Sequence, residues 1–499
     1  MAVVLAIDAG TTGVRTVAFD DRGRPRLASY REFPQHFPQP GWVEHDADDI
    51  WAVTIETLAD VARWADAERE AIAAIGITNQ RETVVVWDRA TGRPRHRAIV
   101  WQDRRTAQRC DALKEAGHEP EIRRATGLVL DPYFSATKLE WLLTEGGVEA
   151  DANLAFGTVD AWLLWRLTGG PGRGVHATDP SNASRTMLFD IRTLAWSDEL
   201  CSLFGVPRAC LPELGPSSGR LGITVPGEAA GLTVPVSGIA GDQQAALFGQ
   251  ACFEPGMMKN TYGTGSFVLV NLGPAVPEPV DGLLNTVAWT IGGATSYAME
   301  GAIFVTGAAV QWLRDGLGII AEAAETGPLA ASVADSGGVH VVPAFTGLGS
   351  PWWDPYARGT VLGITRGTGR AHLARAVVES MALQTVDVVD AICAASGTRP
   401  AEMRVDGGAS VMDLLCQIQA DLLGVPVRRA TIQETTALGA AYLAGIAEGV
   451  WGSAAEAAAA WTADASFNPA IEPDERERRL AAWHRAVERS RGWEQSDAS

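Results

Sequence analysis

A short polar segment between two apolar runs is the first place in this chain where side chains could do chemistry. Asn79, Gln80, Arg81 and Glu82 lie between AIAAIGI and VVVW, two runs whose composition predicts buried strands. Burying an arginine and a glutamate is costly unless the charges are paired or hold a ligand. The alternative is a salt bridge at the surface, worth about 0–1 kcal/mol. The segment therefore predicts a binding site for a polar molecule.

The segment DAGTTGVR, residues 8–15, has the composition of a loop that binds phosphate. Its two glycines allow a tight turn, and the N–H groups and hydroxyls of Thr11 and Thr12 can point at one anion. Asp8 can hold Mg²⁺ through water, because that ion prefers one or two carboxylates together with phosphate oxygens. Arg15 can neutralise charge that develops during phosphoryl transfer. A single hairpin of this kind is more often structural.

Two later segments strengthen the phosphate interpretation. NTYGTGSF contains a second Gly-Thr-Gly turn, in which Thr264 and Gly265 can make another phosphate contact. In VDGGAS, Gly407 and Gly408 allow a base and its ribose to approach the backbone closely. The chain contains no G-x-x-x-x-G-K-S/T loop and no glycine-rich dinucleotide motif after its first strand. Three such loops without a P-loop indicate the ATP cleft shared by actin, heat-shock chaperones and sugar kinases.

Asp242 follows another apolar run, in the segment GIAGDQQ. A carboxylate placed after a strand and a glycine turn can face a cleft. The structural alternative is an N-cap for a helix that begins at Gln243, and this role is compatible with a functional one.

The elements around these segments alternate between strands and helices. Residues 1–20 predict a β-hairpin, and GMMKNTYGTGSFVLVNLG repeats this plan in the second half, which indicates duplicated halves. At 499 residues the chain is also too long for a single core. We therefore expect an α/β fold with mixed sheets and a ligand cleft between two domains, residues 1–250 and 251–499. Helices are expected over residues 48–65, 138–143, 308–317, 372–395, 412–423, 437–448 and 474–490.

Composition narrows the function classes. A formal net charge of −19, without a large basic cluster, argues against a nucleic-acid or anionic-membrane surface. The N-terminal MAVVLAIDAG lacks a basic region and no run of about 18 apolar residues occurs, so we expect a cytoplasmic protein without a membrane span. The six cysteines show no C-x-x-C pair and suit free thiols. The eight histidines show no zinc-ligand spacing.

Along nearly its whole length, the sequence resembles the FGGY family of carbohydrate kinases, part of the actin-like ATPase superfamily. The segments that carry the resemblance include DAGTTGVRTVAFD, PGWVEHDADDIW, TGLVLDPYFSATKLEWLL, FGTVDAWLLWRLTGG, TDPSNASRTMLFDI and ETTALGAAYLAG. NQRET, DPYFSATK and GDQQAALFGQ are typical of the branch that phosphorylates glycerol. The resemblance implies two duplicated RNase H-like domains and direct in-line transfer of phosphate from ATP to glycerol. The product would be sn-glycerol 3-phosphate, in glycerol catabolism.

The resemblance also implies how glycerol is held. Arg81 and Glu82 would bind its hydroxyls, since glycerol needs N–H donors and anionic acceptors together, and the two charges would neutralise each other. Both can reach one ligand only if the strand ends or bulges at residues 80–82. Asp242 would bind glycerol and act as the general base. The remaining glycerol-binding residues would be Tyr133 and Gln243, with Trp101 and Phe267 beside the carbon edge.

For the nucleotide, the resemblance implies a second group of residues. Thr11, Thr12 and Arg15 would contact the phosphates of ATP, with Arg15 also catalytic, and Asp8 would hold Mg²⁺. The other nucleotide-binding positions would be Thr264, Gly307, Gln311, Gly408 and Met412.

Two departures from the family pattern stand out. The family usually has a pair of asparagines where this chain has Met412 and Asp413, so a contact near the purine is expected to be lost. The loop associated with fructose 1,6-bisphosphate inhibition is replaced by PGEAAGLTVP, with Thr233 where an anion-binding arginine would lie. We therefore predict no such inhibition.

Two alternatives stay open. A kinase for another small polyol or ketose would be expected to differ at Arg81, Glu82, Trp101 or Phe267, and none is visibly altered. An actin-like ATPase module would keep the phosphate loops but would not need Arg81, Glu82 and Asp242 together. By analogy with relatives, we expect a homodimer or homotetramer.

Overall fold

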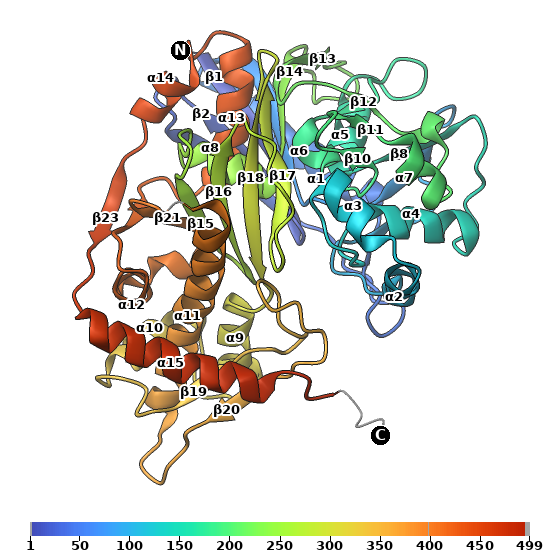
Figure 1. Ribbon diagram of the computed structural model, residues 1–499. Helices are drawn as coiled ribbons and strands as arrows, with labels where there is room; N and C mark the ends of the chain where they lie inside the picture. Colours follow the sequence, from blue (N-terminus) through green and yellow to red (C-terminus); the bar gives the residue numbers. More distant parts are fainter. Residues whose placement is uncertain (1, 398, 495–499) are drawn as a thin grey trace.

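The computed structural model describes residues 2–397 and 399–494 of the chain (Figure 1). A sheet of thirteen strands runs through both halves of the molecule. Between β13 and β17 the structure pairs Ser218 with Ile291, and the two halves of the sheet meet there. From edge to edge the strands are β23 (Ala463–Phe467), β22 (Val427–Ala430), β21 (Met403–Asp406), β15 (Met258–Tyr262), β16 (Ser266–Gly273), β18 (Ala294–Ile303), β17 (Leu284–Ile291), β13 (Ser218–Ile223), β14 (Pro235–Gly241), β5 (Ala71–Asn79), β1 (Ala2–Ala9), β2 (Gly13–Phe19) and β3 (Pro25–Glu32).

Each half of the sheet repeats one arrangement. In the N-terminal half, β1, β2 and β3 are antiparallel, and β5 and β14 follow β1 in parallel. In the C-terminal half, β15, β16 and β18 are antiparallel, and β21 and β22 follow β15 in parallel. Both glycine turns join the first two strands of their half. The predicted α/β class and duplication are confirmed.

Helices cover both faces of the N-terminal half of the sheet. Val3 and Leu5 of β1 belong to the core that includes α1 and α5, whereas Val4 and Ala6 belong to the core that includes α8 and α13. Because both faces of β1 are buried, its sequence is a continuous apolar run rather than an alternating one. These helices are α1 (Ala47–Ala67), α5 (Val159–Leu167), α8 (Asp242–Gly249) and α13 (Thr435–Ala447).

Short elements build a lobe beside the N-terminal half, drawn in cyan and green on the right of Figure 1. Its buried residues form a core of their own, with Phe134, Phe156 and Phe204 among the fully buried side chains. The lobe contains α2 (Ala107–Glu115), α3 (Glu119–Thr126), α4 (Ser135–Thr144), α6 (Pro180–Ala183), α7 (Asp198–Leu203) and strands β4 (Glu44–His45), β6 (Val85–Asp88), β7 (Ala98–Ile99), β8 (Leu154–Gly157), β9 (Ala177–Thr178), β10 (Phe189–Asp190), β11 (Ala195–Trp196) and β12 (Glu213–Leu214).

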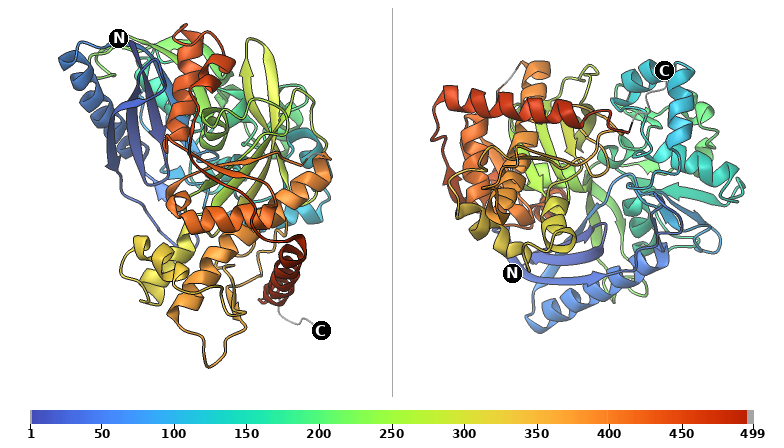
Figure 2. Two further views of the ribbon diagram at one scale, coloured as in Figure 1. Left: turned by 90° about the vertical axis from the view of Figure 1, so that its left-hand side faces the viewer. Right: turned by 90° about the horizontal axis from the view of Figure 1, so that it is seen from below.

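The C-terminal half has a helical layer around a long helix, α11 (Arg370–Ser396). Helix α15 lies across the lower end of this half in Figure 1, and the right-hand view of Figure 2 shows it lengthwise. The other elements are α9 (Gly307–Gln311), α10 (Thr326–Ala331), α12 (Asp413–Leu423), α14 (Ala454–Ala459), α15 (Pro473–Ser490), β19 (His340–Val342) and β20 (Thr360–Leu362).

The seven expected helices are present, with ends that move by a few residues. The clearest difference is over residues 308–317, where α9 ends at Gln311 and a wider π turn continues over Trp312–Gly316. All six cysteines, which lie among the described residues, are free thiols, as predicted. Within the described ranges, no helix is both long and apolar enough to cross a membrane.

Candidate active site

A small cavity of about 140 Å³ lies between the two halves of the molecule. All seven residues predicted to bind glycerol line it. The lining residues are Thr11, Arg81, Glu82, Trp101, Tyr133, Asp242, Gln243, Thr261, Gly263, Thr264, Gly265 and Phe267.

The backbone after β5 explains how Arg81 and Glu82 both reach this cavity. Strand β5 ends at Asn79, and Glu82 adopts a left-handed conformation with φ of 61°. The predicted strand end at residues 80–82 is therefore confirmed. Both side chains are buried, Arg81 at 2% and Glu82 at 1% exposure, which excludes the surface salt bridge.

Arg81 and Glu82 do not mainly neutralise each other, contrary to the sequence-based expectation. Their closest charged atoms are 3.8 Å apart. Arg81 Nε lies 3.1 Å from Asp242 Oδ1, and Arg81 Nη1 donates to Glu300 Oε2 at 2.5 Å. Glu82 instead accepts from Arg185 Nε at 2.7 Å. Five residues therefore share the charge that two were expected to balance.

Arg185 and Glu300 could not be predicted as partners from the sequence, because each pairs with residues more than 100 positions away. Glu300 did carry a usable signal, since it is an acid within the apolar strand β18. That is the same signal that identified residues 79–82. Arg185 lies just after α6, in a segment noted only as part of the family pattern.

Two buried lysines, also missed, hold predicted glycerol-binding residues in place. Lys138 Nζ donates to the carbonyl oxygens of Pro132, Tyr133 and Phe134 at 2.7–2.8 Å, and so fixes the loop that carries Tyr133. Lys259 Nζ donates to Gln243 Oε1 at 2.5 Å. Burial lowers the pKa of each lysine to about 8.

Asp242 is the first residue of α8 and follows β14 directly. Its Oδ1 accepts from the backbone N–H of Gln243 at 2.7 Å, but the N-cap of α8 is Gly241, so the alternative that Asp242 caps a helix beginning at Gln243 is wrong. Burial raises the pKa of Asp242, while the positive charges of Arg81 and Lys259 oppose that rise. Its side chain keeps 29% of its exposure, so the carboxylate can be reached from the cleft.

The first glycine turn meets the small cavity through Thr11. The Thr11 hydroxyl accepts from Trp101 Nε1 at 3.0 Å, which ties the phosphate loop to the aromatic wall. Thr12 lies 3.4 Å from the Tyr30 hydroxyl. Arg15 forms an ion pair with Glu434, just before α13, and Thr12 and Arg15 do not line the cavity.

Asp8 lies at the end of β1 next to this turn. Burial and the negative charge of Asp242 raise its pKa to about 7, and Arg15 partly offsets them. Two neighbouring carboxylates disfavour each other's ionisation, and a divalent cation beside them would reduce this repulsion. The described residues contain no cluster of three or more His, Cys, Asp or Glu suited to hold a metal, so phosphate oxygens would have to complete such a site.

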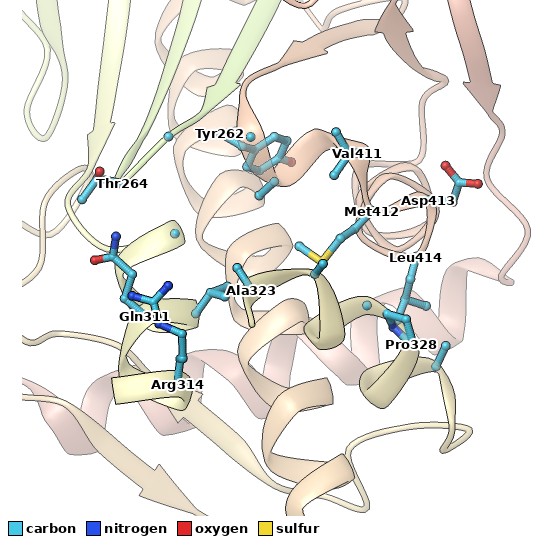
Figure 3. A pocket seen from close by; sticks show the side chains of 18 residues that line it. Tyr262, Thr264, Gln311, Arg314, Ala323, Pro328, Val411, Met412, Asp413 and Leu414 are labelled. Atoms are coloured by element: carbon cyan, nitrogen blue, oxygen red, sulfur yellow. The ribbon is translucent and has the colours of Figure 1, made fainter. Parts of the chain in front are cut away.

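A larger cavity of about 740 Å³ opens next to the small one, and the two share Gly263 and Thr264 (Figure 3). In Figure 3, Gln311 and Arg314 lie on one side of it and Val411 and Met412 on the other. It brings together five predicted nucleotide-binding positions: Thr264, Gly307, Gln311, Gly408 and Met412.

Close backbone contacts shape this larger cavity. A Cβ added at Gly307 would lie 2.6 Å from the carbonyl oxygen of Gly263. Gly407 has φ of 86°, and a Cβ there would lie 2.5 Å from the oxygen of Tyr262. Glycine is therefore required at both turns. Met412 lines the wall where the family has an asparagine, and Asp413 pairs with Arg429 at 2.8 Å.

Comparison with known proteins agrees with this geometry. The family model for the N-terminal domain of the FGGY family of carbohydrate kinases matches residues 3–249, and the model for its C-terminal domain matches residues 258–448. A glycerol kinase of Bordetella parapertussis is 56% identical, with 98% of this chain and 97% of that protein covered. Glycerol kinase 2 of Thermotoga maritima is 55% identical, with 99% and 100% covered.

Solved structures lead to the same family. The crystal structure of Plasmodium falciparum glycerol kinase with ADP has a TM-score of 0.90 and 32% identity, covering 98% of both chains. A ligand-bound xylulose kinase of Lactobacillus acidophilus has a TM-score of 0.86 at 21% identity, which supports the fold alone, over 98% of this chain and 97% of that one. Two duplicated domains, two adjoining cavities and these matches agree: the chain belongs to the FGGY family of carbohydrate kinases.

Proposed function

We propose that this kinase transfers the γ-phosphoryl group of ATP to a terminal hydroxyl of glycerol, giving sn-glycerol 3-phosphate. The observation that carries the proposal is the small charged cavity that meets the larger cavity at Gly263 and Thr264. A volume of about 140 Å³ suits a three-carbon polyol better than a sugar. Relatives above 50% identity named glycerol kinase support the same substrate.

Polar and apolar groups divide the small cavity in the way that glycerol requires. Arg81 supplies N–H donors, and Glu82 and Asp242 supply carboxylate acceptors, all held by other charges. Trp101 and Phe267 have ring centroids 6.4 Å apart and would enclose the carbon edge. The remaining contacts would come from Tyr133 and Gln243. A site that hydrogen-bonds every hydroxyl rejects analogues that lack one.

Asp242 is proposed as the general base. Its carboxylate would accept the proton of the terminal hydroxyl as that oxygen attacks the γ-phosphorus directly and in line. A positioned base contributes about 10²–10⁴-fold in rate. The opposing effects of burial and of Arg81 on its pKa suit a group that must be ionised yet still accept a proton.

ATP is proposed to lie in the larger cavity with its phosphates directed at the small one. Thr11, Thr12 and Arg15 would contact the phosphates, and Arg15 would exchange Glu434 for a phosphate oxygen as the cleft closes. Thr264 and Gly307 would contact the phosphate chain, and Gln311, Gly408 and Met412 the nucleoside.

Asp8 would hold Mg²⁺ through water, together with phosphate oxygens of ATP. When bound, the ion would neutralise charge on the transferring phosphoryl group. Ionisation of Asp8 is unfavourable in the ligand-free cleft, and a cation beside it would reverse this.

We further propose a division of labour between residues 1–250, which hold the polyol and the phosphate loop, and residues 251–499, which hold most of the nucleotide. The six free thiols support a reducing compartment, for which we propose the cytoplasm. A role in glycerol catabolism follows from the proposed reaction. Assembly into a homodimer or homotetramer rests on analogy with relatives.

The test is ADP formation by the purified chain with Mg-ATP and separate acceptors: glycerol, dihydroxyacetone, glyceraldehyde, xylulose and gluconate. The proposal predicts the highest kcat/KM for glycerol, with gluconate and xylulose lower by orders of magnitude. A higher kcat/KM for a five- or six-carbon acceptor would replace glycerol with that acceptor as the substrate.

A further inference from the structure

Behind the wall of the small cavity lies a cluster of four charges, Arg81, Glu82, Arg185 and Glu300, called here the buried ion cluster. Their exposures are 2%, 1%, 0% and 0%. Only Arg81 and Glu82 line the cavity itself. Arg185 and Glu300 form the layer beneath them.

Glu300 uses both carboxylate oxygens to join the two arginines. Its Oε2 accepts from Arg81 Nη1 at 2.5 Å, and its Oε1 accepts from Arg185 Nη2 at 3.0 Å and from Arg81 Nη2 at 3.1 Å. This two-point contact sets the plane of the Arg81 guanidinium. Arg81 Nε then faces Asp242 at 3.1 Å. Glu300 belongs to β18 in the C-terminal half, so a residue of one half orients the donor group of the other.

Arg185 holds the acceptor side of the cavity. Its Nε donates to Glu82 Oε1 at 2.7 Å, and its guanidinium lies 5.7 Å from the centroid of the Tyr133 ring. Burial and, to a smaller extent, the negative charge of Glu300 raise the pKa of Glu82, and the positive charges of Arg81 and Arg185 oppose that rise. Arg185 therefore contacts two residues that line the cavity, although Arg185 itself does not line it.

Net stability does not account for this arrangement. Desolvation offsets the attraction within buried ion pairs, and replacing such a pair with apolar side chains is often neutral or stabilising. The neighbours of Glu300 on the same face of β18 are the buried Ala298 and Ala302, so this face of the strand would accept an apolar residue. Among the described residues, Arg185 Nη1 is also buried without a hydrogen-bond partner, an added cost.

From this geometry we propose that Arg185 and Glu300 are positioning residues that fix Arg81 and Glu82 for recognition of the polyol hydroxyls. Their loss would lower both the affinity and the selectivity for the polyol while leaving the nucleotide cavity intact. This inference rests on the proposed glycerol kinase activity.

The test uses the double variant Arg185→Met/Glu300→Leu, which removes one positive and one negative charge and fills similar volumes. We expect an unchanged or higher denaturation midpoint, a glycerol KM raised about tenfold or more, and an ATP KM changed less than about twofold. Calorimetric titration of glycerol should show the same loss, and the preference for glycerol over propane-1,2-diol should narrow. The matched control is Arg375→Met/Glu379→Leu, an ion pair at 2.8 Å within α11, which should leave both KM values unchanged.

A stable double variant with an unchanged glycerol KM would overturn the proposal. If that variant fails to fold, Glu300→Gln decides, because it keeps the shape of the side chain and removes its charge. A raised glycerol KM in Glu300→Gln supports the positioning role, and an unchanged one overturns it. Absence of glycerol binding and turnover in the wild-type protein would instead refute the proposed function.

Discussion

At the scale of single residues, the proposed general base Asp242 would distinguish a kinase from a binding module. It is the first residue of α8, after the N-cap Gly241, and it lines the cleft, so its functional interpretation does not depend on a capping role. Substitution by asparagine keeps the shape of the side chain but removes the basic site.

We predict that Asp242→Asn lowers kcat with glycerol by about 10²–10⁴-fold, because the attacking hydroxyl loses its proton acceptor. Steady-state ADP formation at saturating glycerol and ATP measures this. Asp46→Asn, which changes the N-cap of α1, is the matched control and should retain full kcat. A kcat for Asp242→Asn within threefold of wild type, a margin of about 0.65 kcal/mol, would remove the base role.

Met412 tests the departure from the family pattern. Met412→Asn is predicted to lower the KM for ATP by about 2–10-fold, since one neutral hydrogen bond is worth about 0.5–1.5 kcal/mol. The kcat should be unchanged because Met412 lines the larger cavity and does not line the small one. Initial rates over a range of ATP and GTP concentrations measure affinity and selectivity. If the ratio of kcat/KM for ATP to kcat/KM for GTP is unchanged in Met412→Asn, the purine lies away from Met412.

Some residues of the site could be predicted from the sequence, and others could not. Arg81 and Glu82 were identifiable because charges stood inside apolar runs, and Asp242 because it followed a strand and a glycine turn. The pairing of Glu82 with Arg185, and of Arg81 with Glu300, depends on side chains from three segments that are far apart in the sequence. Adjacency in the sequence predicts the Arg81–Glu82 pair, which the structure shows at 3.8 Å, but it does not predict these closer partners.

At the scale of elements, a group of three polar side chains holds the first glycine turn in place. Gln80 Nε2 donates to the Gly10 oxygen at 3.0 Å, and Gln35 Nε2 donates to the Thr11 oxygen at 3.1 Å. His45 lies between them, 2.6 Å from Gln35 Oε1 and 3.4 Å from Gln80 Nε2. A neutral imidazole can serve both neighbours, donating to one and accepting from the other.

The buried position of His45 predicts that the free energy of unfolding falls in acid. Burial lowers its pKa to about 4, with a smaller effect from His36, so the unfolded chain binds more protons than the folded one between about pH 6.5 and 4. Its contribution to stability is present above pH 6.5 and is lost, by up to about 3 kcal/mol, as the pH falls through that window. Urea denaturation at pH 7.5 and 5 measures this.

His45→Asn should lessen that difference between pH 7.5 and pH 5, because an amide side chain does not titrate. His96→Asn, at a partly exposed position, is the control and should behave as wild type. Equal pH dependence in wild type and His45→Asn would show that other groups cause the acid sensitivity.

Local patterns were sufficient for most elements. Both hairpins and all seven expected helices are present, because glycine turns and apolar periodicity are encoded locally. The expected helix over residues 308–317 is only partly regular, because α9 ends at Gln311 and a π turn follows over Trp312–Gly316. Apolar periodicity does not distinguish these two kinds of turn.

At the scale of the whole molecule, the two halves share a core around α8 and α13. A Cβ added at Gly439 of α13 would lie 1.8 Å from the oxygen of Ala245 in α8, so the two backbones touch. Helix α13, from the C-terminal part of the chain, also packs against β5 and β14 of the N-terminal half. The duplication was predictable from the repeated hairpins, but this return of the chain was not, because no local feature encodes it.

We predict that Gly439→Ala lowers the free energy of unfolding by about 1–3 kcal/mol or more, because the helices must separate. The kcat should fall as well, since α8 carries Asp242 at its first position. Chemical denaturation and steady-state kinetics measure the two effects. Gly227→Ala is the control, because an added Cβ there meets no atom within 4 Å. A Gly439→Ala variant as stable as this control would contradict the close contact.

The central claim is that phosphate passes from ATP to glycerol inside a cleft that excludes water. The most direct measurement is the stoichiometry of ADP and sn-glycerol 3-phosphate formed by the purified chain with Mg-ATP, with and without glycerol. The account predicts one molecule of sn-glycerol 3-phosphate for each ADP, and a rate of ADP formation without glycerol lower by at least about 10²-fold. ADP formed equally fast without glycerol would contradict it and would favour an actin-like ATPase.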